Sequence, residues 1–505
     1  MTDNKRIAKN TIYLYIRTLV VMIVALYTSR LVLQALGETD LGIYNLVGGI
    51  VALMSFLQSA QTRATSRFIT YELGEGSNGD RMRHVFSSCM TIHIIIAWVI
   101  LLLAETFGLW IINYWTEIPA DRMLAANVVY QFSVLTFVIQ FLRVPFDSVI
   151  IAHENMSVYA YMSIIEVSLK LLVVFALFRI AYDSLILYGI LLCLVAVILF
   201  ICYRVYLRVK LPMYSYRWTW DSALSKKILS FSGWTMLGST TNTATQQGVS
   251  LLLNNFVGLV ANAALGFATQ VSSAVASFVN SFTTAFNPQI TKLYAQGDLN
   301  SMHVLMCRAS KFSFILCYIM ALPLIYNMDY ILGIWLKDVP QYTTVFCQLI
   351  LVCSTIDATS GVFYTGIISA GKIKWYQIAI SCSFLSDLIC SYILLVMGVE
   401  PALVFGSRIF TRGFLNYVIG ILFAKKEIGF GVTNYVKEVM LPILATIAIT
   451  VAVLWCLPQF QSQLAELFAS TALSTIVIVI CLWCFILSRQ ERMQLIGLIK
   501  SKLIK

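Results

Sequence analysis

The sequence predicts an all-α polytopic membrane protein with about fourteen transmembrane helices, and three observations support that fold class. Of its 505 residues, 59% are hydrophobic and only 12% are charged, against about 25% charged residues in an ordinary soluble domain. The apolar residues gather into fourteen windows, each close to the roughly 20 residues that cross a bilayer. Two sets of six windows share a sequence repeat. A soluble chain of this length would need far more polar surface.

The predicted helices follow one another with short connections. The first window is too long for a signal-peptide core and lacks a small-residue cleavage site, so we expect it to remain a membrane helix. The tail from Arg489 alternates basic residues with apolar ones such as Met493 and Ile496, which predicts an amphipathic helix along the membrane surface. The windows lie at 11–36, 41–66, 86–112, 124–150, 157–179, 184–207, 229–254, 258–287, 305–327, 343–369, 373–397, 401–424, 438–457 and 467–488.

The net charge of +11 reflects membrane topology rather than nucleic-acid binding. Basic residues gather before the first window, after the second, sixth, tenth and twelfth windows, and in the tail, and the opposite connections hold mainly acids. Since positively charged connections stay in the cytoplasm, we expect both termini to be cytoplasmic. The densest basic cluster is the connection at 208–228, with Arg208, Lys210, Arg217, Lys226 and Lys227.

A loose internal repeat divides the chain into two halves. Leu41-Gly42-Ile43-Tyr44 and Gly108-Leu109-Trp110 have counterparts in Leu265-Gly266-Phe267 and Gly333-Ile334-Trp335. Six helices per repeat is an even number, so the two lobes share an orientation and are related by an axis along the membrane normal. The predicted domains are an N-lobe at 1–208, a cytoplasmic interfacial linker at 209–228, a C-lobe at 229–426, two C-terminal helices at 427–488 and the tail at 489–505.

Cysteines and histidines form no catalytic or metal-binding pattern. Cys481 and Cys484 make a C-x-x-C, but it lies in an apolar helix without a second pair, where cysteine behaves as a small hydrophobic residue. The histidines are scattered along the chain, at His84, His93, His153 and His303. We therefore expect no cofactor and no enzyme activity. The rival class, a membrane polymerase or glycosyltransferase, would need a carboxylate or histidine cluster on a large loop.

Two short stretches carry a family resemblance. Lys9-Asn10-Thr11-Ile12-Tyr13-Leu14-Tyr15 and Ser66-Arg67-Phe68-Ile69-Thr70-Tyr71-Glu72-Leu73-Gly74, together with six plus six plus two helices, resemble Wzx-type flippases of the multidrug/oligosaccharidyl-lipid/polysaccharide exporter superfamily. The resemblance implies two lobes around a central cavity that opens alternately to each side. It further implies transport of undecaprenyl-diphosphate-linked oligosaccharides through a cationic cavity, whereas the multidrug branch exports organic cations and relies on acids.

Arginines inside the predicted spans favour the cationic branch. A charge at the bilayer centre costs at least about 2.5–3.5 kcal/mol, yet Arg17 and Arg30 lie in the first window. Arg63 and Arg67 lie one turn apart at the end of the second. We expect these four to bind the substrate diphosphate, because a planar guanidinium pairs with two phosphate oxygens. The alternative is that they only reach for the membrane surface, as long basic side chains do near helix ends.

The tenth to twelfth windows hold a second group of charges. At 1.5 Å per residue from the cytoplasmic helix ends, Asp357, Asp387, Arg408 and Arg412 all lie about 18–24 Å deep. Such a cluster has three interpretations: a structural ion pair, the element that couples transport to a proton or sodium gradient, or part of the substrate site. Glu166 and Lys170, spaced i,i+4 in the fifth window, are predicted to pair. Their pair is likewise either structural or functional.

Polar stripes follow the seventh and eighth windows, which contain no charged residue. Asn242 and Gln246 share one face of the seventh, and Asn280 lies on one face of the eighth, with small hydroxyl residues between. Such stripes also serve as packing surfaces between membrane helices. Here we expect a wet cavity wall that contacts sugar.

With the resemblance, these residues predict a flippase of the bacterial plasma (inner) membrane. It would move an undecaprenyl-diphosphate-linked oligosaccharide to the periplasmic leaflet by alternating access, for the biosynthesis of surface polysaccharide such as the O-antigen of lipopolysaccharide. The expected partners are the lipid-linked oligosaccharide, membrane lipids and a coupling proton or sodium ion, with no nucleic acid. The alternative, a multidrug cation antiporter, is disfavoured because the seventh and eighth windows lack acids.

Overall fold

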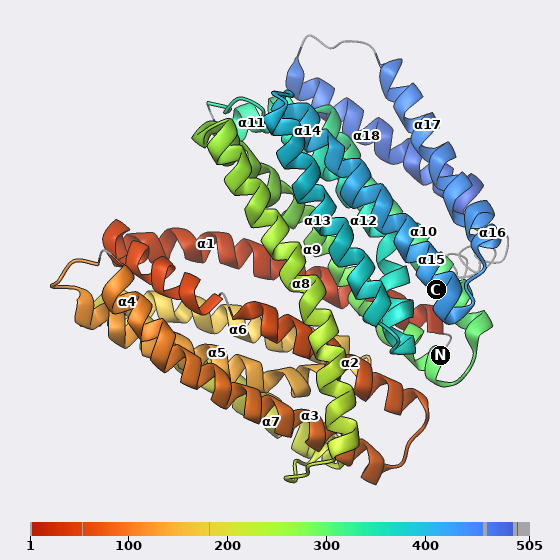
Figure 1. Cartoon of the computed structure of the whole chain (residues 1–505). Helices are drawn as coiled ribbons and strands as arrows, with labels where there is room; N and C mark the ends of the chain where they lie inside the picture. Colours follow the sequence, from red (N-terminus) through yellow and green to blue (C-terminus); the bar gives the residue numbers. More distant parts are fainter. Residues whose placement is uncertain are drawn as a thin grey trace, which may run out of the picture. The chain divides into compact units, whose positions relative to one another are not determined.

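The computed structural model is built from α-helices joined by short connections (Figure 1). It describes residues 3–52, 54–116, 118–180, 182–336, 338–457, 462–487 and 492, and no β-strand occurs among them. The predicted amphipathic tail at 489–505 lies outside the described residues except for Arg492. The all-α fold class predicted from the sequence is confirmed.

The helices form two compact units. The first unit comprises Met1–Thr240 and Thr284–Gly297, and the second comprises Thr241–Thr283 and Asp298–Lys505. Helices α8 (Ser222–Phe256) and α9 (Leu259–Ala295) therefore contribute one end to each unit. The beginning of α8 and the last turns of α9 pack with the first unit, and the predicted lobes at 1–208 and 229–426 stay a prediction.

The remaining elements follow the chain from one unit to the other. The first unit contains α1 (Asp3–Ala52), α2 (Ser55–Gly74), α3 (Gly79–Leu103), η1 (Ala104–Gly108), α4 (Leu109–Trp115), α5 (Met123–Ala152), α6 (Met156–Leu177), α7 (Ser184–Lys210) and η2 (Pro212–Tyr214). The second contains α10 (Leu299–Tyr326), α11 (Met328–Leu336), α12 (Thr343–Ala370), α13 (Lys374–Val396), α14 (Pro401–Arg408), η3 (Ile409–Phe414), α15 (Leu415–Ile428), α16 (Val432–Tyr435), η4 (Val436–Met440), α17 (Leu441–Trp455), α18 (Gln463–Cys481) and η5 (Leu482–Ile486).

Most of the predicted spans coincide with helices that are long and apolar enough to cross a membrane. The described residues contain eleven such helices, or twelve if the bent pair Thr39–Val51 and Ser55–Gly74 forms one span. The two other predicted spans, 229–254 and 401–424, coincide with helices of a different kind. Helix α8 is long but polar, and the helix from Pro401 to Ile428 is interrupted by the π-helical segment η3. The protein is therefore a multi-pass membrane protein.

Helix α1 is bent where the first two predicted spans meet. Gly37 has φ 76° and ψ 175°, a backbone conformation that essentially only glycine adopts without strain. This residue separates the span Lys9–Gly37 from the segment Thr39–Val51. A second bend, of 50°, separates that segment from α2.

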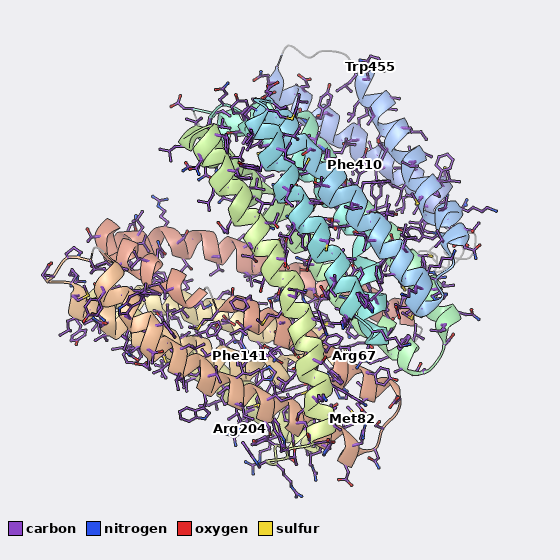
Figure 2. The ribbon with its side chains drawn as sticks, in the orientation of Figure 1. Arg67, Met82, Phe141, Arg204, Phe410 and Trp455 are labelled. Atoms are coloured by element: carbon purple, nitrogen blue, oxygen red, sulfur yellow. The ribbon has the colours of Figure 1, made fainter. Side chains whose placement is uncertain are left out.

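The core of the first unit lies between α5 and α7, which run side by side (Figure 1), and α1 packs along α6. Phe141, labelled in Figure 2, and Tyr130 are both fully buried on α5. The Tyr130 hydroxyl donates a hydrogen bond of 2.7 Å to the carbonyl of Ala104 in the π-helical segment η1. A Cβ at Gly108 would lie 1.8 Å from that hydroxyl oxygen, so the glycine is required for this approach.

The core of the second unit lies between α10, α12 and α15. Phe346 and Phe405 stack with their ring centroids 4.4 Å apart and are both buried. Helices α17 and α18, which stand outside the repeat, are joined to α10 by polar contacts. Tyr318 pairs with Thr450 at 2.8 Å, and the Asn327 amide donates to Ser470 at 2.9 Å.

Candidate functional site

Arg17 lies in the first membrane span and is held by neutral groups. Its Nε donates a hydrogen bond of 2.7 Å to Oγ of Ser163 on α6, and its guanidinium lies 4.8 Å from the ring centroid of Tyr159. No carboxylate of a described residue lies within 4 Å of its side-chain nitrogens. The positive charge is therefore buried in part against a hydroxyl and an aromatic face, without a compensating acid.

The other three predicted arginines of the first unit lie in different surroundings. Arg30 and Arg63 are exposed, on α1 and α2 respectively. Arg67, labelled in Figure 2, lies among aromatic rings, with its guanidinium 4.7 Å from the centroid of Phe68 and 4.8 Å from that of Tyr71. The ring of Phe231, from the beginning of α8, lies at 5.8 Å. Among the described contacts, none links Arg17 or Arg30 to the Arg63–Arg67 pair.

The predicted Glu166–Lys170 pair belongs to a larger network. Lys170 Nζ lies 2.7 Å from Glu166 Oε1, as the i,i+4 spacing predicts. Arg143 on α5 donates from Nη1 to Glu166 at 3.2 Å and from Nε to Asp147 at 3.3 Å. Sequence reasoning missed Arg143 and Asp147, although they show the same i,i+4 spacing inside the fourth predicted span. The network holds two acids and two bases, so its net charge is zero.

A second ion pair that sequence reasoning missed joins the α5–α6 turn to the end of α9. Glu154 is buried, with 3% of its side chain exposed, and its carboxylate accepts from Lys292 Nζ at 2.7 Å. Gln289 donates to the other oxygen of Glu154 at 3.1 Å. Glu154 also has a positive φ of 58°, a conformation uncommon for residues with a side chain. We assign this pair a structural role.

Arg122 bridges two acids at the ends of membrane spans, Asp40 at the start of the segment Thr39–Val51 and Asp183 just before α7. It donates to both oxygens of Asp40, at 2.9 Å from Nε, and to Asp183 at 2.5 Å from Nη1. Asp183 also caps α7 by accepting from the backbone N–H groups of Leu185 and Ile186. Burial opposes ionisation of Asp183, but these hydrogen bonds outweigh it and hold the pKa of that carboxyl below its usual value. A surface cavity of about 500 Å³ adjoins this cluster.

The second unit contains a fully buried acid, Asp387 on α13. Its Oδ2 accepts from Nε of Arg408 at 3.2 Å, and its Oδ1 accepts from the Thr411 hydroxyl at 2.9 Å. The Arg408 guanidinium also lies 4.9 Å from the ring centroid of Phe405. Both carboxylate oxygens of Asp387 are thus satisfied within the fold.

Arg412 turns away from this pair and contacts the polar stripe of α8. Its Nη2 donates to the side-chain carbonyl of Asn242, and its guanidinium lies 5.1 Å from the ring centroid of Phe384. Gln246, one turn further along α8 and exposed, donates to the same Asn242 oxygen at 3.4 Å. The structure therefore brings Asn242 and Gln246 together with an arginine that forms no ion pair among the described residues.

Asp357 and Asn280, the other predicted residues of this unit, are both exposed. Asp357 on α12 forms no ion pair with any residue that the structure describes. The stripes of α8 and α9 contact each other where the Ser250 hydroxyl donates to Oδ1 of Asn262 at 2.5 Å. Part of each stripe thus serves helix packing, and the part near Asn242 faces Arg412.

Sequence comparisons match two family models. The family described as "Polysaccharide biosynthesis protein" matches residues 7–294, and the family described as "MatE" matches residues 235–393. No curated protein matches the chain in sequence.

Solved structures show the same fold at low sequence identity. A MATE protein in its straight conformation is 11% identical, with a TM-score of 0.73, and the match covers 85% of this chain and 96% of that one. A MATE transporter of Vibrio cholerae in the bent form is 14% identical, with a TM-score of 0.67 and coverage of 85% and 99%. A MOP superfamily transporter from Pyrococcus furiosus, described as having a binding pocket of reverse polarity, is 12% identical, with a TM-score of 0.68 and coverage of 83% and 96%.

Proposed function

The chain belongs to the polysaccharide biosynthesis protein family, and we propose that it is a flippase for a lipid-linked oligosaccharide. Membership of that family makes it a membrane transporter of the multidrug/oligosaccharidyl-lipid/polysaccharide exporter superfamily. The substrate would be an undecaprenyl-diphosphate-linked glycan, carried to the periplasmic leaflet of the bacterial inner membrane. Alternating access of the two units would move it, and no covalent bond would be made or broken.

The surroundings of Arg17 are the observation that carries this proposal. A guanidinium inside a membrane span costs free energy unless an acid or an anionic ligand compensates it. Arg17 contacts Ser163 and Tyr159 and no carboxylate. A diphosphate supplies the missing negative charge, and the planar guanidinium can donate two parallel hydrogen bonds to its oxygens.

The second unit offers a similar combination at Arg412. Its hydrogen-bond partner is the neutral amide of Asn242, and Gln246 adds a further exposed amide beside it. A fixed cation next to neutral amides suits a ligand that carries both phosphate and sugar hydroxyl groups. We propose that Arg412, Asn242 and Gln246 contact the substrate, and that Asp387 and Arg408 support them.

The test is deletion of the gene in the host that carries it. Lipid-linked repeat units should then accumulate with their glycans in the cytoplasmic leaflet, where a membrane-impermeant lectin added to intact spheroplasts cannot reach them. Expression of the intact protein should restore access. Normal surface polysaccharide in the deletion strain, or synthesis of longer glycans by the purified protein, would contradict the proposal.

One observation favours a second candidate, export of an organic cation. Asp357 is exposed and unpaired among the described residues, as an acid that binds a cationic substrate would be. Under this alternative, Asp357→Asn should abolish resistance to cationic dyes. Under the flippase proposal, the same variant should leave glycan transport intact, and cells should show no gain of dye resistance from the wild-type protein.

A further inference from the structure

The first unit contains a partly open cavity, lined by both polar and apolar groups, that none of the candidate residues above explains. Its volume is about 300 Å³, and it lies between α1, α2, α5 and α7. Its lining includes the amides of Gln58 and Gln140, the hydroxyls of Ser55 and Ser133, and the rings of Tyr44 and Phe137. Every side chain that lines it is neutral at pH 7.

The cavity lies at the second bend between α1 and α2. Val51 and Ser55 line it from the two sides of that bend, where the helical segments meet at 50°. Interrupted membrane helices free backbone groups that need other partners, and in transporters such interruptions occur where the chain lines a cavity. We therefore expect the interruption of the helix at this bend to be linked to the presence of the cavity.

The two glutamines present unused hydrogen-bonding groups. Neither the Gln58 nor the Gln140 side chain hydrogen-bonds to any residue that the structure describes. Each primary amide offers two donors and one carbonyl acceptor. Groups of this kind in a membrane interior cost free energy when unpaired, so a polar neutral ligand or water must satisfy them.

The aromatic rings limit what that ligand can be. Tyr44 is fixed by an edge-to-face contact with Tyr188, with ring centroids 4.9 Å apart, and Phe137 is buried. Rings offer flat apolar faces, which suit the C–H face of a pyranose, while amides and hydroxyls suit its hydroxyl groups. A charged ligand finds no counter-charge here. The volume lies at the lower end of small-molecule sites, enough for one sugar unit.

We infer that this cavity binds one neutral sugar unit of the transported glycan, while arginines elsewhere hold the diphosphate. The inference rests on the proposed function and adds to it a site that recognises the sugar. It assigns Gln58 and Gln140 as residues that determine glycan specificity, because an amide that loses its sugar partner is left unpaired.

Gly48 allows the cavity to be filled without disturbing the helix. A Cβ at this position would meet no atom within 4 Å, and the residue lines the cavity. Gly48→Leu should therefore occupy the sugar site. Gly49→Leu is the matched control, since a Cβ there also meets open space but Gly49 does not line the cavity. Gln58→Leu with Gln140→Leu removes both amides at similar side-chain size, in case the filled variant does not fold.

The experiment measures lipid binding to the purified full-length protein by native mass spectrometry. The probes are undecaprenyl diphosphate and the lipid-linked oligosaccharide extracted from the deletion strain. The wild type and Gly49→Leu should prefer the oligosaccharide lipid by about tenfold or more, equal to about 1.4 kcal/mol. Gly48→Leu and the double glutamine variant should lose this preference and bind undecaprenyl diphosphate as the wild type does.

Two outcomes would overturn the inference separately from the proposed function. If the wild type prefers the oligosaccharide lipid and both altered proteins keep that preference, the sugar binds elsewhere and the flippase proposal stands. If the wild type binds both probes equally, the cavity does not bind the sugar. If the wild type binds neither probe, the proposed function itself fails, and the inference fails with it.

Discussion

Asp387 is fully buried and accepts a hydrogen bond of 3.2 Å from Nε of Arg408, whereas Arg412, one turn further along, bonds to Asn242 instead. The two arginines differ because the π-helical segment η3 begins directly after Arg408. Hydrogen bonds in a π-helix run from i to i+5, so residues four apart do not share the face that they would share in an α-helix. This insertion separates the ion pair of Asp387 and Arg408 from Arg412, which we propose contacts the substrate.

Replacement of Asp387 by asparagine should destabilise the protein. The variant leaves the buried guanidinium of Arg408 without a counter-charge, and breaking a buried pair typically costs about 3–5 kcal/mol. We expect lower expression and a lower melting temperature in detergent, and partial recovery of both when Arg408→Met is added.

Asp357→Asn serves as the control, because that exposed acid forms no ion pair among the described residues. It should leave the melting temperature near the wild-type value. A stable Asp387→Asn protein whose transport no longer depends on the ion gradient would show instead that Asp387 couples transport to the ion.

Removal of the Arg17 charge should impair transport more than folding. Arg17→Ala loses the proposed phosphate contact, so we expect the transport rate to fall about tenfold or more, the effect of about 1.4 kcal/mol. Arg17→Lys keeps the charge and should retain more activity, although lysine lacks the bidentate geometry. Transport is measured as the return of glycans to the outer leaflet of deletion cells.

Ser163→Ala is the matched control for this position, since it removes the hydrogen bond to Arg17 and keeps its charge. It should transport nearly as well as the wild type. Normal transport by Arg17→Ala at wild-type expression would remove the main support for a cationic phosphate site.

Local spacing and composition were enough to predict the helices and some side-chain pairs. The i,i+4 rule predicts the contact between Glu166 and Lys170, because both lie on one helix. The same rule could have found Arg143 and Asp147, but their link to Glu166 depends on how α5 packs against α6. That packing is a tertiary property, and no spacing within a single helix reports it.

Depth estimates failed to separate Arg408 from Arg412 for a related reason. Counting residues gives the position along a helix but not the direction in which a side chain points, and an α-helix was assumed where η3 lies. The cavity between α1, α2, α5 and α7 was likewise hidden, since Gln58 and Gln140 lie 82 residues apart and lack the periodic pattern that marks α8. The cavity forms only where these four helices pack together.

Acid should weaken the Arg122 cluster. The pKa of Asp183 is lower in the folded protein than its usual value, so the unfolded state binds more protons once the pH falls below about 3.9. The stability that this carboxylate contributes is present above that pH and is lost as the pH falls toward the folded pKa. We expect the melting temperature to drop as the pH falls below about 3.9, with a smaller drop in Asp183→Asn. Arg122→Gln should lower the melting temperature at neutral pH and flatten the same profile. Equal pH profiles for Asp183→Asn and the wild type would contradict this account.

The orientation of the chain can be tested with two cysteines of opposite expected accessibility. The connection at 208–228 carries the densest basic cluster and is predicted to be cytoplasmic, and Arg217 within it is exposed. Cys456 is also exposed and lies at the end of α17, on the periplasmic side under the same topology. In intact cells, a membrane-impermeant maleimide should therefore label the wild-type protein at Cys456, and Cys456→Ser should abolish that labelling. Arg217→Cys introduced into the Cys456→Ser protein should react only after the membrane is permeabilised. Efficient labelling of position 217 from outside, together with protection of Cys456, would mean that the chain is inserted the other way round, with its arginine-rich connections in the periplasm against the positive-inside rule.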